Sequence, residues 1–317
     1  MNIVVLDGYT LNPGDLTWDE LSALGTLTVY ERTATEDIVK RAAGADVVLT
    51  NKTPLSAETI GQLQDLKYIG VLATGYNIVN IEAAAKQGII VTNVPDYSTF
   101  SVVQLVFAFL LERCHHVKEH SDAVHSGRWS AGPDFMFSLH PLYELSGKTM
   151  GIIGFGQIGQ QVARAASAFG MDICVHTRTP KQAAGLEHVR FVSVDELFAQ
   201  SDIVTLHCPL TDETAGIVSS RTLELMKPSA FIINTARGGH IVEQDLADAL
   251  RRGQIAGAAL DVLSVEPPPA NHPLLDTPNC YITPHIGWAT VDARQRLMSI
   301  ASANLRSFME GNAVNRV

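Results

Sequence analysis

Three polar residues in the second half of the chain could act together on a carbonyl group. Arg237 in "FIINTARGGH", Glu266 in "ALDVLSVEPPP" and His285 in "CYITPHIGWAT" each follow an apolar run typical of a strand. A guanidinium can hold a small 2-oxo acid, an imidazole can protonate its carbonyl oxygen, and a carboxylate can orient that imidazole. Taken singly, Arg237 could be an interdomain salt bridge, Glu266 a capping carboxylate and His285 a core histidine. Together they suit hydride transfer to a 2-oxo acid.

The strands that precede these residues belong to two series along the chain. Residues 1–95 contain the runs "NIVVLD", "LTVYE", "DVVLTN", "KYIGVLA" and "GIIVTNV". From Thr149 the rhythm starts again with "MGIIGFG", "DICVHT", "DIVTLHCP", "AFIINTA", "IAGAALDV" and "CYITPH". Helix-length segments separate the runs, which predicts an α/β fold with two doubly wound parallel-sheet domains. Ligands bind such sheets outside the carboxyl ends of the strands, where the three polar residues lie.

Two long helices are expected to connect these domains. One begins near Ser98 and runs through "STFSVVQLVFAFLLERCHHVKEHSDAVHSG". The other covers Val291 to Glu310 and is expected to return to the first domain. Its apolar side is formed by Leu297, Ile300, Ala301, Leu305 and Phe308. The expected domains are therefore 1–97 with 287–317, and 98–286.

Composition narrows the class of protein. The 317 residues are 46% hydrophobic and 18% charged, and the net charge of -10 is spread along the chain. This balance argues against nucleic acid as a partner. No apolar run approaches the roughly 20 residues of a membrane helix, so no membrane is expected. Four scattered cysteines suggest reduced thiols, and "MNIVVLDGYT" resembles a first strand rather than a targeting segment. We therefore expect a cytoplasmic protein.

The stretch "GIIGFGQIGQQVARAASAFG" contains a glycine loop between a strand and a helix. Gly154, Gly156 and Gly159 have the GxGxxG spacing that lets backbone approach a pyrophosphate at a helix N-terminus. A plain strand-to-helix turn is the alternative, but the flanking strand and helix favour dinucleotide binding.

The end of the following strand bears on the choice of cofactor. NAD-binding sheets often carry an acidic residue there for the adenine ribose, whereas this chain has Thr177, Arg178 and Thr179. A cation between two hydroxyls suits a 2'-phosphate, which favours NADP(H) modestly over NAD(H). Alternatively, Arg178 is solvated and the pocket accepts NAD(H).

Two other reactive patterns are assigned no role. His116 and His120 have a helical spacing that could ligate a metal, but no third ligand is evident, and we expect a solvated face and no metal. Cys208 beside His207 is expected to be a small buried side chain rather than a nucleophile.

Nearly the whole chain resembles the D-isomer-specific 2-hydroxyacid dehydrogenase family. The matching segments are "GIIGFGQIGQQVA", "DIVTLHCPLTDETAGIV", "LMKPSAFIINTARGGHIVEQDLADAL", "GAALDVLSVEPPP" and "NCYITPHIGWAT". The resemblance implies a Rossmann nucleotide-binding domain (98–286), a flavodoxin-like substrate domain (1–97 and 287–317) and a homodimer. It also implies that Arg237 binds the substrate, Glu266 partners the histidine and His285 is the general acid.

Further site residues follow from the same resemblance. The backbone of Thr74 and Gly75 would meet the substrate carboxylate, or else form a simple strand-ending turn. Asp261 would lie beside the nicotinamide, or else cap a loop. Trp288 would either line the substrate pocket or belong to the core between the domains. The remaining residues implied to contact the cofactor, besides those of the glycine loop and Thr177 to Thr179, are Gln157, Ile158, His207, Pro209, Thr214, Thr235 and Ala236.

Within the family, "VVLDGYTLNPGDLTWDEL" and "LTNKTPLS" resemble glycerate dehydrogenases, also known as hydroxypyruvate reductases. The expected reaction therefore interconverts hydroxypyruvate and D-glycerate. Glyoxylate or another 2-oxo acid is the alternative substrate, and a nucleotide-sensing module resembling the transcriptional corepressors is the alternative to an enzyme. Formate dehydrogenases share this architecture, but the resemblance implies that they have a glutamine where Glu266 stands here. This difference disfavours a formate dehydrogenase.

Overall fold

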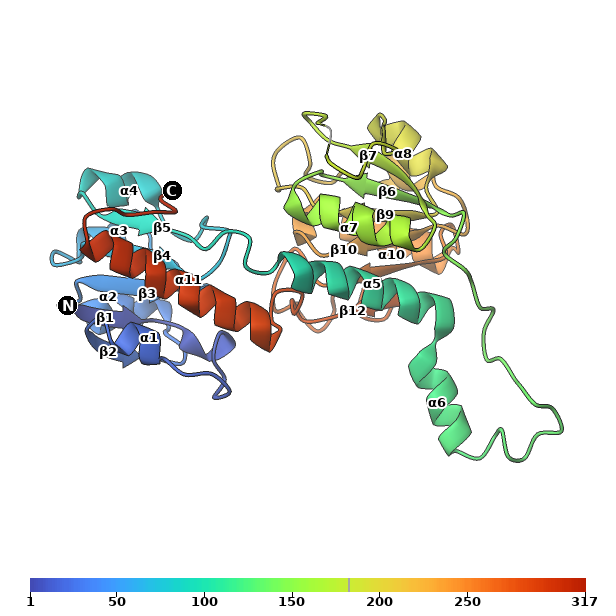
Figure 1. The fold of residues 1–317 in the computed structure, drawn as a ribbon, viewed down its shortest axis with the longest axis horizontal. Coiled ribbons are helices and arrows are strands. Elements are labelled where there is room, and N and C mark those ends of the chain that lie inside the picture. Colours follow the sequence, from blue (N-terminus) through green and yellow to red (C-terminus); the bar gives the residue numbers. More distant parts are fainter. Residues whose placement is uncertain (182) are drawn as a thin grey trace. The chain divides into compact units, whose positions relative to one another are not determined.

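The computed structural model describes residues 1–181 and 183–317, which form two compact units (Figure 1). Unit 1 comprises Met1–Ser98 and Trp288–Val317, and unit 2 comprises Thr99–Gly287. Each unit is an α/β structure built on one parallel sheet, so the predicted fold class is confirmed.

The sheet of unit 1 has five strands in the order β2-β1-β3-β4-β5. All neighbours are parallel, and in the central strands Val48 pairs with Val4 on one side and Ile69 on the other. This is the strand order of flavodoxin-like folds. The strands are β1 (Asn2–Val5), β2 (Thr26–Val29), β3 (Val47–Thr50), β4 (Tyr68–Val71) and β5 (Ile90–Thr92).

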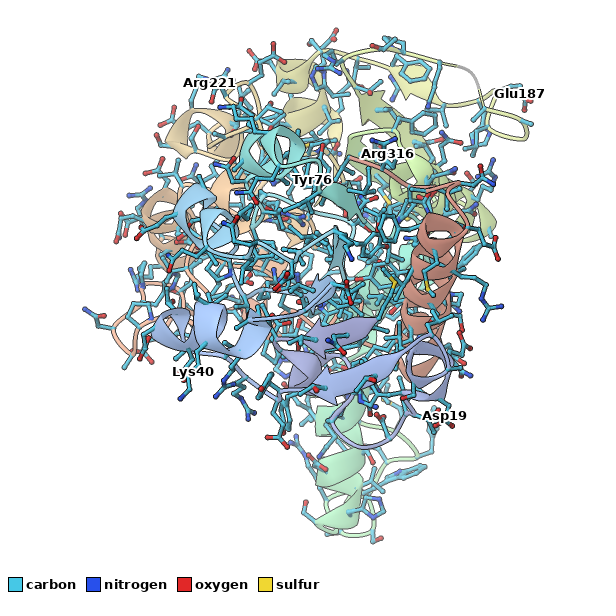
Figure 2. The ribbon with its side chains drawn as sticks, turned by 90° about the vertical axis from the view of Figure 1, so that its left-hand side faces the viewer. Asp19, Lys40, Tyr76, Glu187, Arg221 and Arg316 are labelled. Carbon is cyan, nitrogen blue, oxygen red and sulfur yellow. The ribbon has the colours of Figure 1, made fainter. Side chains whose placement is uncertain are left out.

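Unit 1 carries short helices along its chain and one long helix at its end. The short helices are α1 (Asp19–Ser22), α2 (Ile38–Ala42), α3 (Ala57–Gly61) and α4 (Ile81–Lys86), with 3-10 turns at Gly8–Thr10 and Thr35–Asp37. Exposed charged side chains such as Asp19 and Lys40 project from this unit, and Tyr76 is also exposed (Figure 2).

The long helix α11 (Val291–Met309) belongs to unit 1. The Thr290 hydroxyl caps it by accepting a hydrogen bond from the Ala293 amide at 3.2 Å. The Phe308 ring lies 4.8 Å from that of Tyr68 on β4. The other predicted apolar residues of α11 are buried or half-buried in the same core, namely Leu297, Ile300, Ala301 and Leu305.

The sheet of unit 2 has seven parallel strands in the order β12-β11-β10-β9-β6-β7-β8. The chain reverses its direction of progress between β6 and β9, as in dinucleotide-binding sheets. The strands are β6 (Thr149–Ile153), β7 (Asp172–His176), β8 (Arg190–Phe191), β9 (Ile203–Leu206), β10 (Phe231–Asn234), β11 (Gly257–Leu260) and β12 (Cys280–Ile282). The sequence predicted all of these except the two-residue β8.

Helices cover both faces of this sheet. On one face α5 (Thr99–His115) packs beside α7 (Gln157–Ala168) (Figure 1). Side chains of these helices such as Val106, Leu110 and Val162 are buried. A second core contains buried residues of α8 (Val194–Gln200), α9 (Ser220–Leu223) and α10 (Glu243–Arg251). A 3-10 turn follows β10 at Gly238–His240.

The prediction of one long connecting helix is wrong, because the helix breaks at His116. This residue has φ 46°, a left-handed conformation, and the chain bends by 52° between α5 and α6 (Val117–His125). The His116 ring is buried, and the left-handed backbone allows the chain to turn while that ring stays packed. After α6, residues 126–148 form turns and bends that extend away from the sheet of unit 2 (Figure 1).

Among the described helices, no single one has both the length and the apolar character needed to cross a membrane. Only α5 and α6 taken together pass that test, as a sharply bent pair.

Candidate active site

The glycine loop lies between β6 and α7, and each of its three positions suits glycine for a different structural reason. Gly154 has φ 97°, and a Cβ there would lie 2.6 Å from the Cys208 amide nitrogen. A Cβ on Gly159 would lie 2.1 Å from the Gly154 carbonyl oxygen. Gly156 is the N-cap of α7, and a Cβ there would meet nothing within 4 Å. The loop therefore presents open backbone at a helix N-terminus, where amides and the helix dipole favour a phosphate.

Other residues predicted to bind the nucleotide follow the carboxyl ends of strands in the same sheet. After β7, Thr177 is half-buried whereas Arg178 and Thr179 are exposed. After β10, Thr235 and Ala236 are half-buried, and the buried Thr235 hydroxyl has no hydrogen-bond partner in the described chain. A buried hydroxyl without a partner in the described chain, at the carboxyl edge of the sheet, fits a polar ligand such as a dinucleotide. On α7, Gln157 is exposed and Ile158 is half-buried.

The segment after β9 packs against the glycine loop. His207 bonds to the Thr205 hydroxyl at 2.9 Å, and desolvation lowers the pKa of His207 to about 3, so its imidazole is neutral. The Thr214 hydroxyl donates to the Pro209 carbonyl at 2.8 Å and so holds the turn that follows. Burial raises the pKa of Cys208 to about 11, which keeps the thiol protonated and makes it a poor nucleophile.

His285 and Glu266, from the segments after β12 and β11, meet in the structure. The Nδ1 atom of His285 lies 2.6 Å from the Glu266 carboxylate, whose other oxygen accepts a hydrogen bond from the Leu263 amide at 3.0 Å. Both side chains are partly exposed. His285 adopts φ 55°, a backbone conformation uncommon outside glycine that recurs at functional sites. The predicted imidazole–carboxylate pair is therefore formed.

Arg237 is exposed on a tightly held turn after β10. The buried Asn234 side chain accepts from the Ala236 amide at 3.0 Å and donates to the Arg237 carbonyl at 2.8 Å. His240 also contacts that carbonyl, through Nδ1 at 2.9 Å. These backbone contacts fix the turn while leaving most of the guanidinium N–H groups to bind a ligand.

The Arg237 turn packs directly on the segment that carries Glu266. A Cβ on Gly238 would lie 1.9 Å from the carbonyl carbon of Leu263, so no side chain fits between them. Within unit 2, Arg237, Glu266 and His285 are thus carried by neighbouring segments at the carboxyl edge of one sheet.

Asp261 fixes the segment that contains His285. Its carboxylate, only 2% exposed, accepts hydrogen bonds from the Thr283 hydroxyl at 2.6 Å and the amides of Ile286 and Gly287 at 2.7 Å each. Desolvation raises the pKa of Asp261. These bonds join the end of β11 to both sides of His285, a positioning role that sequence spacing alone does not reveal.

A second carboxylate holds the other side of the pair. Glu243, at the start of α10, accepts from the Ser264 amide at 2.7 Å and contacts the Nε2 atom of the buried His272 at 3.0 Å. This anchors the chain two residues before Glu266. Sequence reasoning missed Asn234, Glu243 and His272. The partners of Glu243 and His272 lie in distant segments, whereas Asn234 bonds within its own turn. The nearest signal was the polar character of residues in otherwise apolar segments.

The remaining predicted residues belong to unit 1. Thr74 follows β4; its hydroxyl donates to the Val94 carbonyl at 2.9 Å and its own carbonyl accepts from Asn93 at 2.7 Å, while the next residue, Gly75, is half-buried. Trp288 is half-buried and packs edge-on against Tyr97, with ring centroids 6.5 Å apart. The structure therefore places Trp288 on the core of unit 1.

Known proteins share this sequence and architecture. A sequence profile for the NAD binding domain of D-isomer specific 2-hydroxyacid dehydrogenases matches residues 107–287. The hydroxypyruvate reductase of Blautia hydrogenotrophica is 49% identical, with 100% of this chain and 99% of that protein covered. The glycerate dehydrogenase of Methylorubrum extorquens is 36% identical, with coverage of 99% and 98%. A solved acyclic imino acid reductase in complex with NADPH and D-Arg is 30% identical, with a TM-score of 0.85 and 100% of both chains covered.

The family match, which the strand order and the imidazole–carboxylate pair accompany, identifies a nicotinamide-dependent oxidoreductase with two α/β units. The chain belongs to the D-isomer specific 2-hydroxyacid dehydrogenase family.

Proposed function

We propose that this enzyme interconverts hydroxypyruvate and D-glycerate. The observation that carries the chemistry is the 2.6 Å contact between His285 and Glu266 beside the Arg237 turn. The choice of substrate is supported by the 49% identity to a hydroxypyruvate reductase over the whole chain.

In the proposed reaction, His285 acts as the general acid. Since its Nδ1 atom is bonded to Glu266, Nε2 is the ring nitrogen that gives a proton to the substrate carbonyl oxygen. The Glu266 carboxylate stabilises the imidazolium and fixes the ring orientation. A bound reduced nicotinamide supplies the hydride that the carbonyl carbon accepts.

The proposed substrate-binding residues are Arg237, Thr74, Gly75 and Trp288. The Arg237 guanidinium holds and polarises the 2-oxo acid, because a planar fork of N–H groups matches a carboxylate. The backbone amides of Thr74 and Gly75 bind the substrate carboxylate, and the absence of a Cβ at Gly75 permits close approach. Trp288 supplies an apolar surface for the substrate chain.

The dinucleotide is assigned to the carboxyl edge of the unit 2 sheet. Its pyrophosphate binds at Gly156 and the start of α7, where a Cβ on Gly156 would meet nothing within 4 Å. The exposed Arg178 favours a 2'-phosphate, so we propose a modest preference for NADPH. The Arg178→Ala variant is expected to lose about tenfold in kcat/KM for NADPH with little change for NADH; equal losses for both would remove this assignment.

Steady-state kinetics test the proposed substrate. Purified enzyme should oxidise NADPH or NADH with hydroxypyruvate, glyoxylate and pyruvate offered in parallel. We expect the highest kcat/KM for hydroxypyruvate. Nucleotide binding without oxidation by any of these acids would instead support a nucleotide-sensing module.

We also propose a homodimer. Exposed apolar side chains gather between residues 117 and 142 of unit 2, and Phe135 is 89% exposed. The others in this region are Val117, Val124, Trp129, Met136 and Leu142. A protruding segment with this character is typical of an association surface. Sedimentation of wild type and Phe135→Ser tests the proposal, because the variant should shift toward monomer.

The four cysteines form no disulfide in the described chain, which suits the cytoplasmic location that we propose.

A further inference from the structure

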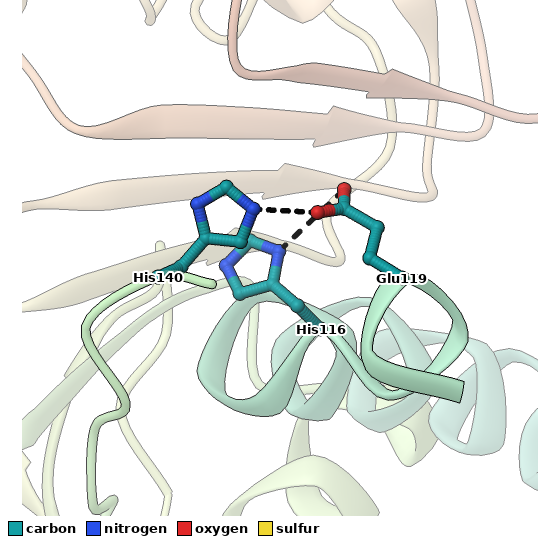
Figure 3. A group of neighbouring side chains, drawn as sticks. All are labelled: His116, Glu119 and His140. Atoms are coloured by element: carbon teal, nitrogen blue, oxygen red, sulfur yellow. Dashed lines mark hydrogen bonds and ion pairs between the residues drawn. The ribbon is translucent and has the colours of Figure 1, made fainter. Parts of the chain in front are cut away.

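A group of metal-ligating side chains lies in unit 2 outside the proposed catalytic residues. His116, Glu119 and His140 each offer a ligand atom, and these atoms all lie within 4.8 Å of one another (Figure 3). We propose that these three residues bind one zinc ion, which fixes the segment after α6 to the start of that helix.

His116 supplies the least accessible ligand. Its side chain is only 10% exposed, and the buried Nδ1 atom has no hydrogen-bond partner in the described chain. The nearest carboxylate oxygen, on Glu119, is 3.9 Å away, too far for a hydrogen bond. A metal ion would satisfy this orphaned nitrogen.

Glu119 and His140 face the same point from different segments. The Nε2 atom of His140 lies 2.5 Å from the Glu119 carboxylate, and its ring centroid lies 4.3 Å from that of His116. A metal would take the place of the proton in the first contact. Glu119 and His140 are 53% and 44% exposed, so an ion and a water ligand can enter from solvent.

The spacing of the ligands suits zinc after small side-chain movements. Zinc bonds of about 2.0–2.1 Å to nitrogen and oxygen place tetrahedral ligands roughly 3.3 Å apart. The His140 Nε2 atom lies 2.5 Å from one carboxylate oxygen of Glu119, and the His116 Nδ1 atom lies 3.9 Å from the other, so the side chains must shift for zinc to bind all three residues. Two imidazoles with one carboxylate suit zinc better than calcium or magnesium, which prefer sets of oxygen ligands.

The segment that carries His140 is already held near this point. His120 accepts a hydrogen bond from the Leu139 amide at 3.0 Å through Nε2, and its Nδ1 lies 2.9 Å from the His116 carbonyl oxygen. His120 is therefore a positioning residue rather than a ligand. The expectation that His116 and His120 share a solvated face is wrong for His116, whose ring is buried. Zinc would add a second link between α6 and residues 126–148, which contain no helix or strand.

Zinc titration of the full-length, tag-free protein tests the site. After removal of metals with a chelator, the protein should bind one equivalent of zinc in competition with a chromogenic chelator. The variants His140→Ala and Glu119→Gln should bind at least about tenfold more weakly. His125→Ala removes an exposed histidine from the same helix and should bind as wild type does. Equal affinity in all four proteins, or no zinc bound by wild type, would overturn the proposal.

Three further readouts test the site and separate it from the catalytic residues. Cobalt substitution should give the visible absorption of four-coordinate cobalt in wild type and His125→Ala but not in His140→Ala. Zinc should also protect residues 126–148 from proteolysis in the same two proteins. Nicotinamide oxidation should be unchanged by metal removal, because no proposed catalytic residue ligates the zinc; activity lost with the metal would overturn the structural role.

Discussion

Gly156→Ala should separate nucleotide binding from folding. The substitution places a methyl group at the N-cap of α7, where nothing lies within 4 Å, and the backbone angles of -76° and -164° suit alanine. If the pyrophosphate binds this backbone, the methyl group occupies the space that the phosphate needs. The variant should therefore fold normally and bind nucleotide poorly.

The size of both effects can be worked out. Alanine restricts the unfolded chain, which stabilises by about 0.4–1 kcal/mol, but it is a poorer N-cap than glycine by a similar amount. The free energy of unfolding should thus change by less than about 1 kcal/mol. Losing one charge-assisted hydrogen bond to a phosphate costs about 1.5–3 kcal/mol, which weakens nucleotide binding roughly 10- to 100-fold.

Gly159→Ala is the matched contrast. Its Cβ would lie 2.1 Å from the Gly154 carbonyl oxygen, so the helix must move and the protein should lose about 1–3 kcal/mol of stability. Urea denaturation and fluorescence titration with NADPH and NADH measure the two quantities in each variant. Nucleotide binding by Gly156→Ala at the wild-type affinity would rule out a pyrophosphate at this backbone. An equal loss of stability in both variants would show that Gly156 is required for folding as Gly159 is.

Three further predictions concern the acid, its supports and unit 1. His285→Ala should lower kcat by about 10²- to 10⁴-fold while nucleotide affinity stays unchanged, and unchanged turnover would end the general-acid assignment. Asn234→Ala should raise KM for the oxo acid and cost about 1–3 kcal/mol of stability, since it leaves the Ala236 amide unpaired; unaltered kinetics would contradict this role. In unit 1, a hydrogen bond from Arg294 lowers the pKa of Asp15 below its ordinary 3.8. A carboxyl whose pKa is lower in the folded than in the unfolded protein stabilises the fold at pH values above its unfolded-state pKa. This contribution is lost on acidification, so Asp15→Asn should flatten the stability–pH curve below about pH 4. Parallel curves for the two proteins would exclude the pair as a source of acid sensitivity.

The strands and their ends could be predicted from sequence because buried parallel strands leave a strong local signal. "DVVLT" and "AFIINTA" are nearly continuous apolar runs, and the polar residues just after such runs meet at one edge of a sheet. This is why the pairing of Glu266 with His285 could be expected from residue type and position.

The features that could not be predicted from the sequence depend on three-dimensional contacts or on segments too short to show a pattern. The helical pattern continues through His116, and only the burial of its ring shows why the helix breaks there. The two residues of β8 are too few for a periodicity to appear. Glu119 and His140 are 21 positions apart, and no local motif joins them. Asn234 reads as the polar end of a strand until its contacts are seen.

The stereochemistry and stoichiometry of the product formed from hydroxypyruvate would test the proposed reaction itself. Purified enzyme should consume reduced nicotinamide and hydroxypyruvate in equal amounts and release D-glycerate, which chiral chromatography resolves from the L-isomer. We expect one D-glycerate for each nicotinamide oxidised. L-glycerate, or no glycerate while nucleotide remains bound, would show that the enzyme does not catalyse this reaction.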